Sequence, residues 1–167
     1  MSEIHDQTQA RPKRDLLIIG WIEHLDLPQL GLTQIKVKVD TGARTSALHA
    51  TYIYTFWRDG VEWVRFVVPL DDSDNGPEVE APVHDRRIIK NTSGMSEERI
   101  TIRTKMRLAG RSWTIPVSLT DRSDMRLPMI VGRTALKGHN IAVHTRRANL
   151  TRALGHNRPI AGREDMS

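Results

Sequence analysis

The most regular feature of this chain is the strict alternation of apolar and polar residues in two segments. From residue 33 to residue 39, Ile35, Val37 and Val39 alternate with polar positions that include two lysines. From residue 99 to residue 108, apolar positions alternate with arginine and lysine, in the sequence RITIRTKMRL. A two-residue period puts alternate side chains on opposite faces of a strand. Each segment is therefore predicted to be a strand with one buried face and one basic face.

Apolar runs that end in turn residues predict further strands. The runs are LLIIGWI (16–22), VEWVRFVVPL (61–70) and LPMIVG (127–132). The last is apolar almost throughout, as expected of a strand buried on both faces. DDSDNGP closes the second run with turn-forming residues. Ala109-Gly110-Arg111 predicts a tight turn from 99–108 into a return strand that reaches residue 119, which makes a hairpin.

One short helix is predicted directly after the last strand. RTALKG begins at Arg133 and is closed by Gly138, the residue type that most readily ends a helix. Many short strands and one helix predict an all-β domain. We expect this domain to cover residues 16–145, between a flexible N-terminal arm (1–15) and a basic, flexible C-terminal tail (146–167).

Composition narrows the cellular setting and the kind of partner. With 167 residues the chain is long enough for one domain with a real core. It has no cysteine and no apolar run of ~18 residues, and its first residues lack the apolar run of a signal peptide. We therefore expect a cytoplasmic protein with no membrane association. The net charge of +5 favours anionic partners, which could be nucleic acid, lipid headgroups or an acidic polypeptide.

The candidate chemistry lies where the strand 33–39 ends. Asp40 follows that strand and is followed at once by Thr41 and Gly42. Aspartic proteases place Asp-Thr-Gly at such a turn, where glycine allows a tight backbone and the hydroxyl holds the loop. Their chemistry needs two carboxyl groups that share a proton. Because this chain has a single such tripeptide, a catalytic pair would need Asp40 from each of two copies in a homodimer.

A second motif, Ile130-Val131-Gly132, occurs near the end of the predicted domain. In the retropepsin fold an apolar-apolar-glycine segment crosses the Asp-Thr-Gly segment in a ψ-shaped loop beneath the active site. Three stretches, VKVDTGARTSALHA, KNTSGMSEERITI and SLTDRSDMRLPMIVGRTAL, resemble in their order the RimB family, whose members are often labelled "ATP-dependent zinc protease". The resemblance covers about residues 16 to 145.

This resemblance implies a retropepsin-like closed barrel with the short helix after the Ile-Val-Gly-Arg motif. It also implies an aspartic endopeptidase that trims the glutamate tail added to a small-subunit ribosomal protein by a RimK-type ligase. Asp40, Thr41 and Gly42 would be the catalytic motif, and the ligase is a further possible partner. The resemblance leaves open whether the protease acts on another peptide.

Basic residues near the two motifs are candidates for binding an acidic substrate. Arg44 follows Asp40 and Arg133 follows Gly132, so both are expected to border the cleft. If the basic face of the hairpin looks inward, five further cations could line the walls, namely Lys90, Arg99, Arg103, Lys105 and Arg107. Guanidinium groups bind carboxylates in a bidentate manner. The alternatives are a solvated outer face for the hairpin and local ion pairs for Arg44 and Arg133.

The zinc and ATP of the family label have no counterpart in the motifs. The chain has no His-Glu-x-x-His, no cysteine ligands and no Gly-x-x-x-x-Gly-Lys-Ser/Thr loop. We therefore expect no metal and no cofactor. His49 and His84 are interpreted as ordinary histidines, and Arg122 as a partner of Asp121 or Asp124.

A different class of function stays open, a basic β-domain that binds ribosomal RNA. The net charge and the basic tail favour it. Against it, the basic residues do not alternate with surface aromatic residues in the sequence, as they do in many single-strand binders. It also leaves the pairing of Asp-Thr-Gly with Ile-Val-Gly unexplained.

Overall fold

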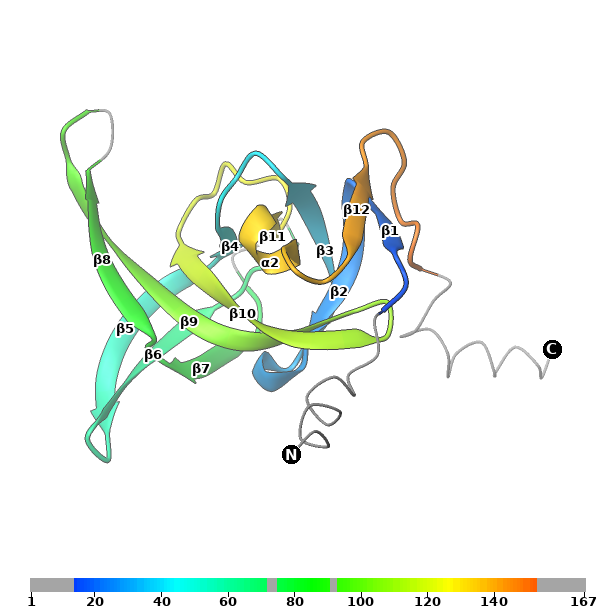
Figure 1. The fold of residues 1–167 in the computed structure, drawn as a ribbon. Helices are drawn as coiled ribbons and strands as arrows, with labels where there is room; N and C mark the ends of the chain where they lie inside the picture. Colours follow the sequence, from blue (N-terminus) through cyan, green and yellow to red (C-terminus); the bar gives the residue numbers. More distant parts are fainter. Residues whose placement is uncertain (1–13, 72–74, 91–92, 153–167) are drawn as a thin grey trace, which may run out of the picture.

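The computed structural model describes residues 14–71, 75–90 and 93–152, without the side chains of residues 89 and 90, and it is built almost entirely of strands (Figure 1). The strands are β1 (Leu17–Gly20), β2 (Ile22–Leu27), β3 (Leu32–Asp40), β4 (Ser46–His49), β5 (Thr51–Arg58), β6 (Val61–Val67), β7 (Glu78–Pro82), β8 (Asp85–Lys90), β9 (Ser96–Leu108), β10 (Arg111–Thr120), β11 (Met129–Gly132) and β12 (Ile141–His144). The helices are a 3-10 turn, η1 (Pro28–Leu30), and α2 (Arg133–Leu136). The predicted all-β class with one short α-helix after Gly132 is confirmed.

Six strands close into a barrel in the order β10, β4, β11, β3, β2, β9. Closure comes from β9, which pairs with β2 at Asp26 and Arg107 and with β10 along residues 100–108. The barrel interior is filled by the buried faces of these strands, which include Val37, Ile102 and Val117. The closed barrel that the family resemblance implied is therefore present.

The two alternating segments are strands with the faces that the sequence predicts. Ile35, Val37 and Val39 of β3 are buried, whereas Lys36 and Lys38 between them are exposed. The apolar residues of β9 are likewise buried, and the basic residues Arg103, Lys105 and Arg107 face solvent. The hairpin of β9 and β10 turns at Ala109 and Gly110 as expected.

The predicted strand 16–22 is in fact two strands that belong to different sheets. The chain bends at Trp21, so that β1 pairs in parallel with β12 and β2 pairs with β3. At the bend the Trp21 N–H donates to the Arg147 carbonyl, while the Trp21 carbonyl accepts from the Val39 N–H. Gly20 has no room for a side chain, because an added Cβ would lie 2.4 Å from the Arg147 oxygen.

The chain remains packed beyond residue 145, where the predicted domain ends. The carboxylate of Glu23 is fully buried and accepts hydrogen bonds from the N–H groups of Gly20, Leu150 and Thr151 and from the Thr151 hydroxyl. Residues 146–152 are thus part of the folded unit and not of a tail. Residues 1–13 and 153–167 of the predicted arm and tail lie outside the described residues.

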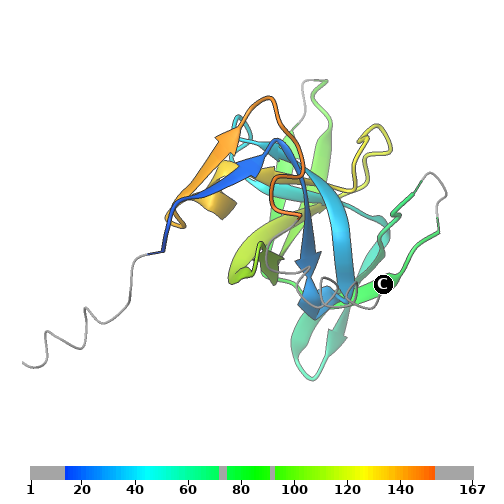
Figure 2. The ribbon, with the colours of Figure 1, turned by 90° about the vertical axis from the view of Figure 1, so that its right-hand side faces the viewer.

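Three strand pairs project from the barrel. Figures 1 and 2 show β1 and β12 side by side as a separate pair on one flank. On the opposite side of Figure 1, the β8–β9 hairpin and the β5–β6 hairpin extend away from the barrel. The Arg86 guanidinium ties the two hairpins together through ion pairs with Glu98 and Glu62. Within the described residues, no helix is long and apolar enough to cross a membrane.

Candidate active site

The two motifs singled out in the sequence lie next to each other. β3 and β11 are parallel neighbours, and their register pairs Gly132 with Asp40 and Val131 with Val39. β11 is also hydrogen-bonded to β4. It therefore lies between β3 and β4, the strands before and after the Asp-Thr-Gly turn. The apolar run at 127–132 was predicted to be a strand buried on both faces, and its last four residues form β11. Met129, Val131 and Gly132 are buried, but Ile130 is half-buried, so one face of this strand is partly open.

We call residues 40–45 the catalytic loop, after the role that is predicted for Asp40, and its backbone is held by hydrogen bonds at both ends. The Gly42 N–H donates to Asp40 Oδ1 over 3.0 Å, and the Ala43 N–H donates to the Asp40 carbonyl over 3.0 Å. The start of α2 holds the far end of the loop, since the Arg133 N–H donates to the Ala43 carbonyl over 2.9 Å. The Thr134 hydroxyl donates to the Arg44 carbonyl over 2.7 Å. The position of the Asp40 carboxylate is therefore fixed by this chain alone.

Gly132 allows β11 to approach the loop more closely than any other residue could. A Cβ at this position would lie 2.6 Å from both the carbonyl carbon and the carbonyl oxygen of Thr45. The Gly132 N–H donates to Ser46 Oγ over 3.0 Å, and the Ser46 carbonyl in turn accepts from the Ser118 hydroxyl. The side chain of Ser46 is buried, so this contact joins β11 to β4 in a site without solvent.

Arg133 supports the loop. Its Nη1 lies 3.4 Å from the Thr41 carbonyl and 3.3 Å from the Gly42 carbonyl, and it donates to both. These contacts give Arg133 a positioning role, and binding of substrate by this residue stays a prediction. The Thr41 hydroxyl, expected to hold the loop, has no hydrogen-bond partner among the described residues, and Thr41 is exposed.

Arg44 and Arg133 line the same hollow, which we call the flank hollow. It has a volume of about 710 Å³ and lies between the catalytic loop and the β1–β12 pair. Its walls combine apolar side chains with cations and hydroxyls, namely Trp21, Val39, Leu136, Ile141, Val143, Arg44, Arg133, Lys137, Thr41, Thr134 and Thr145. The structure thus brings both predicted arginines beside the motif. The strand face of Val39, however, is the face opposite to that of Asp40.

The face of β3 that carries Asp40 leads into a second hollow, the β3-face groove. Alternation along β3 puts Lys36, Lys38 and Asp40 on one face. The groove has a volume of about 580 Å³, and its lining includes Lys38, Ile22, Ile130, Arg122 and residues 124–127. This groove lies on the same strand face as the candidate catalytic carboxylate.

Two cations that were not predicted as site residues, Lys38 and Arg126, line this groove. Lys38 and Arg126 have no ion-pair partner among the described residues, whereas Arg122 lies 3.4 Å from Asp124 Oδ1, the pairing that was expected for it. The alternation that identified β3 could have found Lys38, because it stands two residues before Asp40. Arg126 had no such signal, since only the fold brings the 121–128 loop over β3.

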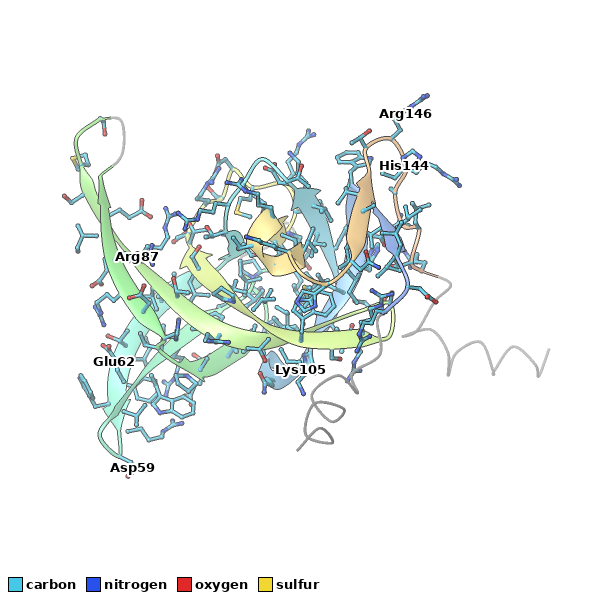
Figure 3. The ribbon with its side chains drawn as sticks, in the orientation of Figure 1. Asp59, Glu62, Arg87, Lys105, His144 and Arg146 are labelled. Atoms are coloured by element: carbon cyan, nitrogen blue, oxygen red, sulfur yellow. The ribbon has the colours of Figure 1, made fainter. Side chains whose placement is uncertain are left out.

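The cations predicted for the walls are not gathered at Asp40. Arg99 lies in the β8–β9 hairpin and pairs with Glu97 over 3.3 Å. Arg103 and Lys105 face solvent on β9, and the Lys105 N–H is bonded to Gln29 of η1, at the start of β3 (Figure 3). Asp40 ends that strand, ~26 Å further along at ~3.3 Å per residue. The side chain of Lys90 lies outside the described residues.

No metal site is formed by the part of the chain that the structure describes, where no three His, Asp or Glu side chains gather. His49 contacts backbone atoms of Thr120 and Arg122. The pKa of His24 is lowered by burial and by the nearby charges of Arg152 and Lys36.

Surface aromatic residues do lie among arginines, in contrast to the expectation from the sequence. On the solvent face of the β5–β6–β7 sheet, Arg58 stacks on Phe56 and Trp63, and Arg65 stacks on Tyr54 and Phe56. The sequence hides this arrangement because cross-strand pairing creates it. Both guanidinium groups are bonded to Glu80 over 2.8 Å, so its single negative charge offsets one of their two positive charges.

Several curated proteins are similar in sequence to most of this chain. A probable alpha-L-glutamate ligase from Desulfotalea psychrophila is 47% identical over 121 residues, which are 71% of this chain and 26% of the relative. Proteins of the same description from Parasynechococcus marenigrum and Shewanella pealeana are 42% and 39% identical over 73% and 74% of this chain, and 27% and 28% of their own lengths. The chain therefore spans about a quarter of the length of these curated relatives.

A solved structure has a similar fold, and a family model matches the sequence. A crystal structure of a Legionella pneumophila protein of unknown function aligns with a TM-score of 0.67 and 28% identity, over 82% of this chain and 99% of that one. The model of the RimB-like family, described as retropepsin-like aspartic endopeptidase RimB, matches residues 18–152. This match covers the barrel, both motifs and the packed segment after β12. The chain therefore belongs to the RimB-like family of retropepsin-like aspartic endopeptidases.

Proposed function

We propose that this protein is a homodimeric aspartic endopeptidase that hydrolyses peptide bonds in an oligoglutamate tail. The observation that carries the proposal is the placement of Asp40 at the end of β3, in register with Gly132 and in a loop fixed by its own chain. The chain supplies a single Asp-Thr-Gly, so the second carboxyl group comes from Asp40 of a second copy.

In the proposed reaction the two carboxyl groups share one proton, because two adjacent negative charges repel each other. The ionised group takes a proton from water, and the water oxygen attacks the carbonyl carbon of the peptide bond. The protonated group gives its proton to the carbonyl oxygen as that oxygen gains charge. When the tetrahedral intermediate collapses, the C–N bond breaks and the leaving nitrogen takes the proton that the first carboxyl group removed from water. A hydroxyl proton of the intermediate returns to the second carboxyl group, and a new carboxyl group and a new amine are released.

The surface around the catalytic loop is suited to a second copy. Thr41, Gly42 and Arg44 are exposed, and Trp21 in the wall of the flank hollow keeps 38% of its surface in solvent. Such side chains gain free energy when a partner covers them. A two-fold axis beside the loop would bury this surface and bring the two Asp40 side chains together.

Positive charge on the face of Asp40 supports an acidic substrate. The Lys38 ammonium and the Arg126 guanidinium have no ion-pair partner among the described residues, so both could bind carboxylates of a substrate. A two-fold axis would place two copies of each group in the dimer. The curated relatives are described as probable glutamate ligases, and this chain corresponds to a quarter of each. We propose that it removes glutamates that a RimK-type ligase adds to a small-subunit ribosomal protein, and that this ligase is a partner.

The test is incubation of the purified protein with a peptide that ends in ten α-linked glutamates, with products measured by mass. The native protein should shorten the tail, and Asp40→Asn, which is nearly identical in shape, should not. Mixing the two proteins in equal amounts tests the shared site, because random pairing leaves about one quarter of the dimers fully native. The activity per native chain should then fall by about half, whereas a monomeric enzyme would keep all of it.

A ribosomal RNA-binding domain is the second candidate, and the stacked arginines and aromatic rings on β5 and β6 favour it. The ion pairs of Arg58 and Arg65 with Glu80 weaken this interpretation. The Asp40→Asn variant separates the candidates. It should end hydrolysis and leave RNA affinity unchanged if RNA binds elsewhere on the chain.

A further inference from the structure

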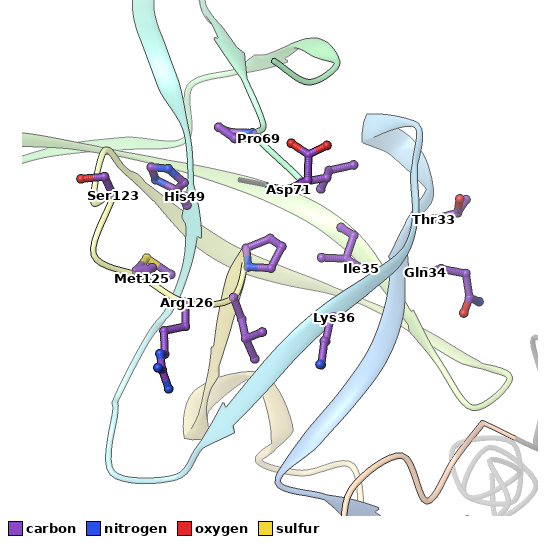
Figure 4. Close-up of a pocket in the computed structure, with 13 residues that line it drawn as sticks. Thr33, Gln34, Ile35, Lys36, His49, Pro69, Asp71, Ser123, Met125 and Arg126 are labelled. Atoms are coloured by element: carbon purple, nitrogen blue, oxygen red, sulfur yellow. The ribbon is translucent and has the colours of Figure 1, made fainter. Parts of the chain in front are cut away.

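A pocket further along β3 from Asp40 is not used by the proposed reaction, and we call it the distal pocket (Figure 4). It has a volume of about 440 Å³ and lies where the start of β3 meets the 123–128 segment and the 69–71 segment. It meets the β3-face groove, because Met125, Arg126 and Leu127 line both hollows. The two hollows therefore form one path along the β3 face.

Hydrogen-bond donors are present on several sides of the distal pocket. Lys36 approaches from β3 and Arg126 from the loop, as Figure 4 shows, and neither has an ion-pair partner in the described part of the chain. The Ser123 hydroxyl adds a neutral donor. Among the lining residues that the structure describes, Asp71 is the one acidic residue, against two cations, Lys36 and Arg126. A carboxylate is a suitable ligand for such a set of groups.

His49 also lines the pocket, and its Nδ1 is engaged by the backbone. Nδ1 lies 3.1 Å from the Arg122 N–H and 3.3 Å from the Thr120 carbonyl oxygen. Nε2 is therefore the ring nitrogen left for a ligand, and it donates to a carboxylate when it carries the proton.

Most of the remaining lining residues are apolar, and the two polar ones are Thr33 and Gln34. Pro69 is buried, while Met125, Leu127 and Pro128 are half-buried and lie beside the charged groups. Apolar walls suit the methylene groups of a glutamate side chain, and they strengthen the interaction between its carboxylate and the cations by excluding water.

The distance from Asp40 indicates which part of a substrate could reach the pocket. Asp40, Lys38 and Lys36 are on one face of β3, and two residues of a strand span ~6.6 Å. Lys36 is therefore ~13 Å from Asp40 along the strand. An extended peptide has the same rise per residue, so ~13 Å corresponds to about four substrate residues.

We propose that the distal pocket binds the side-chain carboxylate of an acidic residue about four positions from the cleaved bond of the same tail. This inference rests on the proposed function and adds a second recognition point to it. In the dimer the two distal pockets would be on opposite sides of the Asp40 pair. Cleavage should therefore become more efficient as the tail lengthens to about eight glutamates and then level off.

The experiment measures the binding of fluorescent tetraglutamate and decaglutamate to the Asp40→Asn protein, with and without Lys36→Gln. Loss of Lys36 should weaken binding of the decamer about fivefold and change binding of the tetramer less than twofold. Lys105→Gln is the matched control, since it removes the same charge from a residue that lines none of these hollows. Binding needs no catalysis, so an uncleaved tail would overturn the proposed reaction and leave this test intact.

Two results would overturn the distal pocket as a site for the tail. The first is an equal effect of Lys36→Gln on tetramer and decamer, or no effect on either, because the pocket then contributes no length-dependent contact. The second is a decauridylate that binds with the same Lys36 dependence and displaces the decaglutamate. That result would assign the pocket to nucleic acid.

Discussion

Gly132→Ala tests whether the close approach of β11 to the catalytic loop shapes the site. The substitution adds one methyl group and leaves the strand hydrogen bonds chemically possible. The new Cβ would lie 2.6 Å from the Thr45 carbonyl carbon, 2.6 Å from its oxygen and 2.9 Å from its nitrogen. All three atoms belong to the backbone, so no side-chain rotation can relieve the contact.

The expected loss of stability follows from this geometry. Ordinary carbon contacts are ~3.5 Å or longer, so either β11 or the loop must move by most of an ångström. Overpacking of this kind lowers the free energy of unfolding by about 3 kcal/mol. For a domain of this size the melting temperature should fall by about 6–12 °C. The displacement would also weaken the hydrogen bond between the Gly132 N–H and Ser46 Oγ.

Thermal unfolding, followed by circular dichroism, should be measured together with cleavage of the decaglutamate peptide. Gly60→Ala is the control, because Gly60 lies in the β5–β6 turn at φ +79° with open space around it. It should lower stability by about 1 kcal/mol through backbone strain alone and leave cleavage unchanged. If Gly132→Ala unfolds at the same temperature as the control and keeps full activity, the close approach is not a constraint on the site.

Three further outcomes are expected. Ser46→Ala should lower the free energy of unfolding by about 1–3 kcal/mol in urea titration, because it leaves the Gly132 N–H buried without an acceptor. Lys38→Gln should raise KM for an acidic peptide about fivefold at low salt with little change in kcat, and this difference should shrink as salt is added. Burial and neighbouring cations lower the pKa of His24 in the folded protein. The unfolded chain therefore takes up this proton at a higher pH than the folded protein does. The free energy of unfolding should fall as pH drops below ~6.5. Melting temperatures at pH 5 and pH 8 should differ more for the native protein than for His24→Gln.

The strands that follow a simple period could be predicted from the sequence. β3 and β9 have one buried and one solvated face, so the two-residue alternation is complete. β1 and β2 could not be separated, because the bend at Trp21 depends on hydrogen bonds to Arg147 and Val39, which are distant in the chain. The packing of Thr151 on Glu23 was missed for the same reason, since local composition suggested only a basic tail.

The part of the candidate site that is continuous in sequence could be predicted. The part that the fold assembles from distant segments could be predicted less well. Asp40, Thr41 and Gly42 are consecutive, and the register with Gly132 follows from two apolar strands that the pattern identifies. The walls were different. Arg103 and Lys105 point outward because their neighbours fill the barrel, while Arg126 reaches the β3 face only through the course of its loop.

Each chain of the proposed dimer would bring a catalytic loop that is already ordered. The loop bonds of Asp40, Gly42 and Ala43, and those from α2, are all made within one chain. A single copy therefore already holds its carboxylate in place, and the second copy supplies the other carboxyl group without having to build the loop. The free energy of association need not offset the ordering of that loop. On this reasoning dilution should abolish hydrolysis by separating the two Asp40 side chains, while each loop keeps its conformation.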